Sequence, residues 1–267
     1  MTTQVSLHRS IRQLAIAASA IAAFGFAGLS VSRADDATAG KILKAMSDYI
    51  GAQKSFSVTF DSDIEVITQD LQKIQFDSSG QVLLSRPDKL RASRLGGYAD
   101  VELVFDGKTA TLLDKASNAY FQTEAAGSVD QLINKLRNEL AIELPGADIL
   151  NGNVYDTLMA NVVDAKYIGR GVIDGVECEH LAFRDADTDW QIWVELGARP
   201  IPRKYVITSK AVTAAPQYTL RIKEWRTDPA APDAFAFHPP QGAKAVALAD
   251  LRHLDEVPEG TVAGEHK

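Results

Sequence analysis

The chain has 267 residues, 46% hydrophobic and 24% charged, and its formal net charge is −7. This length suits one large domain or two small ones, and the acidic balance argues against binding nucleic acid or anionic lipid surfaces by charge. The single cysteine, Cys178, excludes an intramolecular disulfide bond. A hydrophobic core therefore has to stabilise the fold.

The first 34 residues have the three parts of a secretory signal peptide. A short region with two arginines precedes an uncharged apolar run over 14–31, and small residues at 32 and 34 precede Asp35. We expect cleavage after residue 34 and a periplasmic location. The run of 18 residues could also serve as an uncleaved anchor. Cleavage would remove three arginines and no carboxylate, so the net charge would change from −7 to −10.

Helical periodicity follows over 35–55, where apolar residues recur at intervals of three and four. This spacing predicts an amphipathic helix of about four turns, and Gly51 is a suitable end for it. The apolar positions are Ile42, Leu43, Met46, Tyr49 and Ile50.

The period changes to two at residue 55, which predicts a long half-buried strand through 67. The next strand segment, 73–85, contains Asp77-Ser78-Ser79-Gly80, where we expect a turn. Another extended segment follows Arg86-Pro87. The stretch 100–122 predicts two hairpins, the first with a turn at Asp106-Gly107.

A second helical segment begins near residue 128. Ser128 and Gln131 fit a capping box, Leu140 continues the apolar stripe, and Pro145-Gly146 ends the helix. A weaker helix with an internal glycine follows to residue 160. Strands resume over 165–227 with a hairpin turn at Asp174-Gly175. From residue 244 onward the composition predicts a loose tail.

No segment alternates strand and helix in the manner of a parallel sheet. The successive hairpins instead predict one large antiparallel sheet, which must twist and curve because about ten strands cannot stay flat. Three helices are available to cover its apolar face. That face could be filled by a packed core, or it could leave space for an apolar ligand, and the residue pattern leaves both possibilities open.

Four stretches in order resemble the periplasmic lipoprotein carriers of the LolA and LolB type. They are the strand, Arg-Pro bend and strand of 82–91, the paired hairpins of 102–122, the helical insert of 128–160, and "FAFHPPQGAK" at 235–244. More closely, the chain resembles a family of predicted periplasmic proteins of uncharacterised function that share this fold. Leu90-Arg91 stands where a carrier would have aromatic residues, and the insert is expected to carry a longer helix.

The resemblance implies an α+β, mainly β fold: an incomplete antiparallel barrel of about eleven strands with covering helices. We expect a single half-barrel domain over 35–247 and a polar tail over 248–267. The implied role of Arg86 is a lid gate, in which its guanidinium donates to backbone carbonyls of the helical cover. The residues expected to line an apolar cavity are Phe56, Val58, Phe60, Ile64, Val66, Phe76, Leu84, Leu103, Phe105, Leu132, Ile133, Leu136, Leu140 and Trp190.

Catalytic and metal-binding patterns are weak. Cys178 and His180 share one strand face but have no identifiable third partner. Three carboxylates at 61, 63 and 65 are spaced too widely along a strand to share one calcium ion. Trp190 and Trp193 have opposite parity, so one should face the concave side and the other should not. We therefore expect no catalytic residues, no metal site and no cofactor.

The sequence predicts a periplasmic, non-enzymatic, monomeric protein that binds a lipid or other apolar ligand in a half-barrel. An envelope protein is a further expected partner, and nucleic acid is not. The alternative is a protein–protein interaction or envelope-sensing module on the same scaffold.

Overall fold

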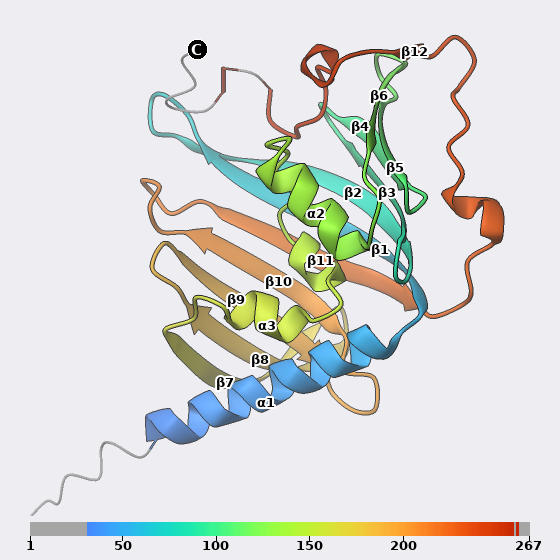
Figure 1. Ribbon diagram of the computed structural model, residues 1–267. Coiled ribbons are helices and arrows are strands. Elements are labelled where there is room, and N and C mark those ends of the chain that lie inside the picture. Colours follow the sequence, from blue (N-terminus) through green and yellow to red (C-terminus); the bar gives the residue numbers. More distant parts are fainter. Residues whose placement is uncertain (1–30, 259, 262–267) are drawn as a thin grey trace, which may run out of the picture.

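The computed structural model describes residues 31–258, 260 and 261. They form one open sheet of twelve strands in the order β12-β6-β5-β4-β3-β2-β1-β11-β10-β9-β8-β7, with helices over one face (Figure 1). The strands are β1 (Ser55–Ile67), β2 (Lys73–Ser85), β3 (Lys89–Gly96), β4 (Asp100–Phe105), β5 (Thr109–Asp114), β6 (Ala119–Glu124), β7 (Asp164–Ile173), β8 (Val176–Arg184), β9 (Thr188–Glu195), β10 (Pro202–Ser209), β11 (Gln217–Arg226) and β12 (Lys244–Ala245). The helices are α1 (Val31–Ala52), α2 (Val129–Asn138) and α3 (Val154–Met159), with 3-10 helices η1 (Ala147–Leu150), η2 (Pro232–Phe235) and η3 (Leu248–Asp250).

The sheet is unclosed because its edge strands, β12 and β7, lie at opposite ends of the strand order. Strands β1 to β11 pair antiparallel, whereas the two-residue β12 pairs parallel with β6. The prediction of an incomplete antiparallel barrel of about eleven strands is confirmed. The expected turns at Asp106-Gly107 and Asp174-Gly175 both connect neighbouring strands, and both glycines have positive φ.

The predicted turn at 77–80 is wrong, because these residues lie inside the continuous strand β2 and pair with 60–63 of β1. Gly80 is required there by packing: a Cβ on it would lie 2.4 Å from Cζ of Phe60. The hydroxyl oxygens of Ser62 and Ser78 are 2.8 Å apart on the same face. Small polar residues that resemble a turn in sequence thus make room for a ring and pair with each other across two strands.

Helix α1 packs against β7, β8 and β9 and contacts α3. Leu43, Met46 and Ile50 are fully buried, as their spacing predicted. The helix begins at Val31, before the expected cleavage point, and residues 1–30 of the expected signal peptide lie outside the described residues. Among the helices that the structure describes, none is long and apolar enough to cross a membrane.

Helix α2 begins with the predicted capping box, in which Ser128 and Gln131 satisfy each other's backbone N–H groups. It ends at Asn138, earlier than predicted, because Ala141 adopts a left-handed conformation with φ of 52°. Leu140 therefore lies beyond the helix, although it still packs against the core. The weaker helix expected after Gly146 is divided into η1 and α3.

The expected loose tail is a misprediction for residues 244–256. Lys244 and Ala245 form β12, and a backbone hydrogen bond from Val246 to Tyr120 follows it. Leu251 and Glu256 are only 7% and 6% exposed. This part of the chain therefore returns to the sheet after leaving η2.

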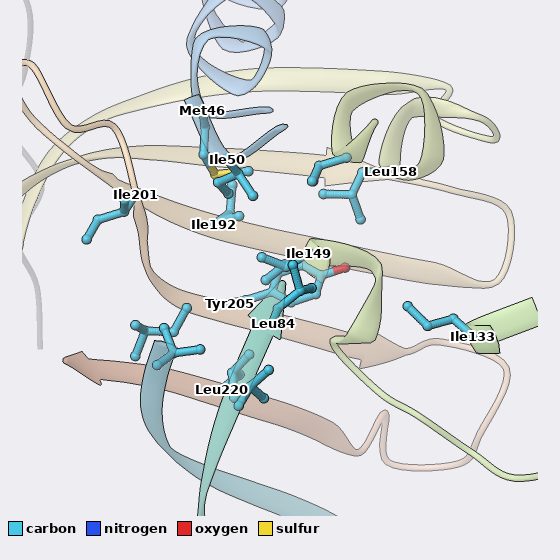
Figure 2. Packing of buried hydrophobic residues seen from close by; sticks show 14 of the residues in the cluster. Met46, Ile50, Leu84, Ile133, Ile149, Leu158, Ile192, Ile201, Tyr205 and Leu220 are labelled. Atoms are coloured by element: carbon cyan, nitrogen blue, oxygen red, sulfur yellow. The ribbon is translucent and has the colours of Figure 1, made fainter. Parts of the chain in front are cut away.

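One hydrophobic core joins the sheet to all of its covering segments. Figure 2 shows side chains from α1 (Met46, Ile50), η1 (Ile149) and α3 (Leu158) in the same cluster as the strand residue Ile192. Trp190 and Trp193 face opposite sides, as predicted: Trp190 is buried and stacks on Phe183, whereas Trp193 stacks on His180.

We predict that Phe56→Ala lowers the free energy of unfolding by about 3–5 kcal/mol, since it leaves a cavity in the core. Phe56 is fully buried and stacks on Trp225 with ring centroids 4.5 Å apart. Urea unfolding followed by tryptophan fluorescence measures the change. Val172→Ala, at a side chain 65% exposed on β7, is the control and should shift stability by no more than about 0.5 kcal/mol. Equal effects of the two substitutions would contradict this account of the core.

Candidate functional site: an apolar cavity beneath the helical cover

A cavity of about 200 Å³ lies between the inner face of the sheet and the segment that contains α2 and η1. We call the segment 129–153 the cover. The sheet lines the cavity with Val58, Phe60, Val82, Leu90, Ala92, Ser93, Arg94, Val101, Leu103, Leu112, Tyr218, Leu220, Ile222 and Trp225. The cover lines it with Ile133, Leu136, Ile142, Glu143, Leu144, Pro145, Gly146, Ala147, Ile149 and Leu150, and the C-terminal segment adds Leu254 and Asp255.

Strand register explains why the apolar wall is continuous. One row crosses six strands: Trp225 is opposite Val58, which is followed in turn by Val82, Ala92, Leu103 and Leu112. Side chains directly opposite each other in neighbouring strands point to the same face. Ala92 is the smallest member of the row and lies near its middle, so the row leaves space there instead of filling it.

The cavity has one polar end. Arg94 lies one pair beyond Ala92 on the same face of β3, opposite Gly80 of β2. Tyr218 of β11 also lines the cavity, and burial raises the pKa of its hydroxyl to about 12, so the hydroxyl stays protonated. Arg94 is the only lysine or arginine among the described residues of the cavity wall.

Five of the fourteen side chains expected from the sequence line this cavity: Val58, Phe60, Leu103, Ile133 and Leu136. The other nine are not part of its wall. Phe56, Leu84, Phe105, Leu132 and Trp190 belong to the packed core, Leu140 packs against that core, and Ile64, Val66 and Phe76 lie farther along β1 and β2. Parity therefore identified the inner face, but it could not separate the filled part of that face from the hollow part.

The polar end of the cavity was not predicted from the sequence. Arg94 shares the even parity of Leu90 and Ala92, which would have indicated a cation on the apolar face of β3. Leu254 and Asp255 were missed because the C-terminal segment was expected to be loose.

Arg86 holds the cover at its C-terminal end. Its Nη2 donates a hydrogen bond of 3.1 Å to the carbonyl oxygen of Asn151, between η1 and α3. Burial lowers the pKa of the Arg86 guanidinium, and the nearby Asp130 carboxylate offsets part of this effect. This is the contact that the resemblance implied for the Arg-Pro bend, although a contact alone does not make Arg86 a gate.

One more hydrogen bond connects the bend and the cover, and another contact joins the two ends of the cover. The amide of Val129 donates to the carbonyl of Pro87 at 2.9 Å, and the amide of Gly152 donates to both carboxylate oxygens of Asp130 at 3.1 Å. The start of α2 and the loop before α3 are thereby fixed at the same rim of the sheet. The middle of the cover, residues 142–150, lies over the cavity mainly through apolar side chains.

The geometry around the sequence candidates for catalysis does not form a nucleophilic site. Burial raises the pKa of the Cys178 thiol, and Arg203 offsets part of that rise. Burial lowers the pKa of His180, whose ring pairs with Gln191 and stacks on Trp193. In the part of the chain that the structure describes, no group of three His, Cys, Asp or Glu side chains is placed to hold a metal ion.

The cavity is small for a lipid. Pockets for drug-sized ligands usually have volumes of roughly 300–1,000 Å³, above the 200 Å³ found here. A longer apolar ligand would therefore require the cover or the C-terminal segment to move away from the sheet.

The chain matches one family of known proteins. The model of the family described as "Predicted periplasmic protein (DUF2092)" matches residues 39–249. No curated protein matches the chain.

Several solved structures are similar at low identity. An uncharacterised conserved protein from Thermus thermophilus is 12% identical over 78% of this chain and 98% of its own, with a TM-score of 0.48. The lipoprotein LppX from Mycobacterium tuberculosis is 13% identical over 74% and 100% of the two chains, with a TM-score of 0.38. The LolA superfamily protein NE2245 from Nitrosomonas europaea is 12% identical over 74% and 97%, with a TM-score of 0.39. Likeness at this level says nothing about what this chain binds.

We predict that Cys178 reacts slowly with a soluble thiol reagent at neutral pH, because its thiol is buried and kept protonated. The same reagent should modify it rapidly in guanidinium chloride. Absorbance of the released thiolate measures both rates. A rapid reaction in the folded protein would show that the thiol is activated and would favour an enzymatic role.

Proposed function

Since this chain belongs to the DUF2092 family of predicted periplasmic proteins, we propose that it binds a lipid or another ligand with acyl chains in the periplasm and does so without catalysis. We further propose that export removes residues 1–34 and leaves one half-barrel domain. The observation that carries the proposal is the apolar cavity between the sheet and the cover.

The chemistry of the wall favours an acyl chain. Of the side chains that the sheet contributes, all but Ser93, Arg94 and Tyr218 are hydrocarbon or indole. Each methylene group moved from water into such a wall contributes about 0.8 kcal/mol. A chain of many methylenes could therefore supply enough free energy to offset the displacement of the cover.

The attachment of the cover supports reversible binding. At the rim its anchors are a few hydrogen bonds. A neutral bond contributes about 0.5–1.5 kcal/mol of net stability, and the one from the charged Arg86 guanidinium to Asn151 contributes about 1.5–3 kcal/mol. Losing them does not disrupt the strand pairs beneath. We therefore assign Arg86 the role of a gate that favours the closed cover.

A second candidate function is docking of a protein partner on the edge strand β7. Val163, Ile168 and Val172 are 73%, 53% and 65% exposed along this edge. An unpaired strand edge can add a strand from another chain. This function predicts a protein that is purified without lipid.

The main test is organic extraction of the natively purified protein, followed by mass spectrometry. We expect a co-purified lipid or fatty acid in a stoichiometric amount. A protein that contains no lipid, and that also fails to bind apolar fluorescent probes, would contradict the proposal and favour the docking function.

Ala92→Phe is the matched variant for this test, because a ring at the smallest position of the apolar row would occupy the cavity. We expect it to reduce the co-purified lipid several-fold. Ala182→Phe, on the opposite face of the sheet from Leu181 of the core, should leave the lipid content unchanged. Equal lipid in all three proteins would show that the ligand lies elsewhere.

We predict that Arg86→Leu accelerates release of a bound apolar probe, since the variant loses the hydrogen bond to Asn151. Loss of one bond from a charged donor should raise the release rate by roughly 10–100-fold. Stopped-flow fluorescence measures the rate, and Arg184→Leu, an exposed arginine on β8, controls for the lost charge. Unchanged ligand retention in Arg86→Leu would show that Arg86 is not a gate.

A further inference from the structure

Three polar side chains interrupt the inner face of the sheet at one end of the cavity. Ser62 of β1 and Ser78 of β2 are directly opposite each other, and their hydroxyl oxygens are 2.8 Å apart. Arg94 of β3 is one row closer to the apolar wall and forms part of the cavity lining. We call these three residues the polar patch. Phe60, which lies between Ser62 and Val58 on the same face of β1, connects the patch to the apolar row.

The chain's own C-terminal segment places a carboxylate on this patch. Oε1 of Glu256 accepts a hydrogen bond of 2.7 Å from Ser78, is 3.5 Å from the hydroxyl of Ser62, and is 3.1 Å from Nε of Arg94. The side chain of Glu256 is 5% exposed. Arg94 also donates to the carbonyl oxygen of Leu254, a residue of the cavity wall. Residues 254–256 thus close this end of the cavity with a buried anion.

The fit between Glu256 and the patch is incomplete. Oε2 of Glu256 is buried and has no hydrogen-bond partner among the described residues, and Nε–H of Arg94 is also without an aligned acceptor. A buried charged group left partly unpaired is destabilising relative to one whose hydrogen-bonding capacity is used. The patch can therefore accept an anion that uses its donors better than Glu256 does.

We propose that Arg94, Ser62 and Ser78 bind the anionic head group of a single-chain amphiphile whose acyl chain lies in the apolar cavity. Glu256 occupies the same site when no ligand is bound, and its departure carries Leu254 and Asp255 out of the cavity wall. This inference rests on the proposed function and names the ligand class for it. The chemistry shared by a fatty-acid carboxylate and a lysophospholipid phosphate is the set of anionic oxygens that a guanidinium and two hydroxyls recognise.

Three observations favour a head-group site over a purely structural ion pair. The cation belongs to the cavity wall, and the occupying carboxylate comes from a segment that also lines the cavity. One oxygen of that carboxylate has no hydrogen-bond partner among the described residues. A structural ion pair such as Arg91 with Glu102 has a different geometry: two hydrogen bonds of 3.1 and 2.9 Å use both carboxylate oxygens.

The test compares the full mature chain with Glu256→Gln by titration calorimetry. The probes are hexadecanoate, hexadecyl phosphate and the neutral hexadecanol, which share one chain length. Glu256→Gln should bind the anionic probes tighter by roughly tenfold or more, the effect of freeing one charge-assisted contact. Its affinity for hexadecanol should change much less. The relative gain for the two anions identifies the preferred head group. Glu224→Gln, at a carboxylate 58% exposed, is the control. It should change neither the affinity for the anionic probes nor the affinity for hexadecanol.

The double variant Arg94→Gln with Glu256→Gln removes both charges and so avoids an unpaired buried ion. We expect it to fold, to bind hexadecanol, and to lose the preference for anionic probes. An equal gain for neutral and anionic probes in Glu256→Gln would overturn the head-group site, because the segment would then act only as a plug. No gain for any probe would also overturn it.

The hexadecanol arm separates this inference from the proposed function. If the wild-type protein binds hexadecanol but Glu256→Gln shows no anionic preference, the cavity binds apolar chains and only the head-group site is wrong. If none of the proteins binds any of the three probes, the proposed function is wrong and the head-group site is wrong as well.

Discussion

The pairing of β1 with β2 is the constraint on which the rest of the structure depends. Thirteen consecutive residue pairs fix its register from Ser55 with Ser85 to Ile67 with Lys73. Because side chains alternate between faces, a shift of one residue would move every inner side chain to the outer face. The core, the apolar row of the cavity and the polar patch all lie on this one face, so a single register positions all three.

The same face is closed by different kinds of contact along its length. Near Phe56 and Leu84 it is packed by fully buried side chains, and removing one would be strongly destabilising. Over the cavity it is covered by Ile133 and Leu136 of α2 and by residues 142–150, and at the polar patch it is covered by residues 254–256. The cavity lies at these last two places, where no strand pairing holds the covering segments to the sheet.

The sequence pattern predicted the structural features that depend on residues close together along the chain. The alternation in β1, the hairpin turns and the capping box at Ser128 are local, and the structure confirms them. The pattern failed where a distant partner decides the outcome. Position 80 is a glycine within a strand because the ring of Phe60 fills the space that a side chain there would need. The segment around Glu256 is ordered because Arg94 and Ser78 lie beneath it. These partners come from other strands and are not near neighbours along the chain, so no local signal could have indicated the contacts.

Arg86 at the rim of the sheet and Arg94 in the cavity wall differ in what they bind, and this difference sets how each contact responds to its surroundings. Arg86 donates to a neutral carbonyl at the rim, a contact that changes little with salt. Arg94 faces a carboxylate, and its side chain is 24% exposed, so added ions or a competing anion weaken that contact more. Under the proposed function, an anionic amphiphile would compete directly at the Arg94 contact, and the cover near Arg86 would yield to the volume of the chain that follows. These two contacts favour entry from the polar end, with the head group exchanging for Glu256 before the cover moves.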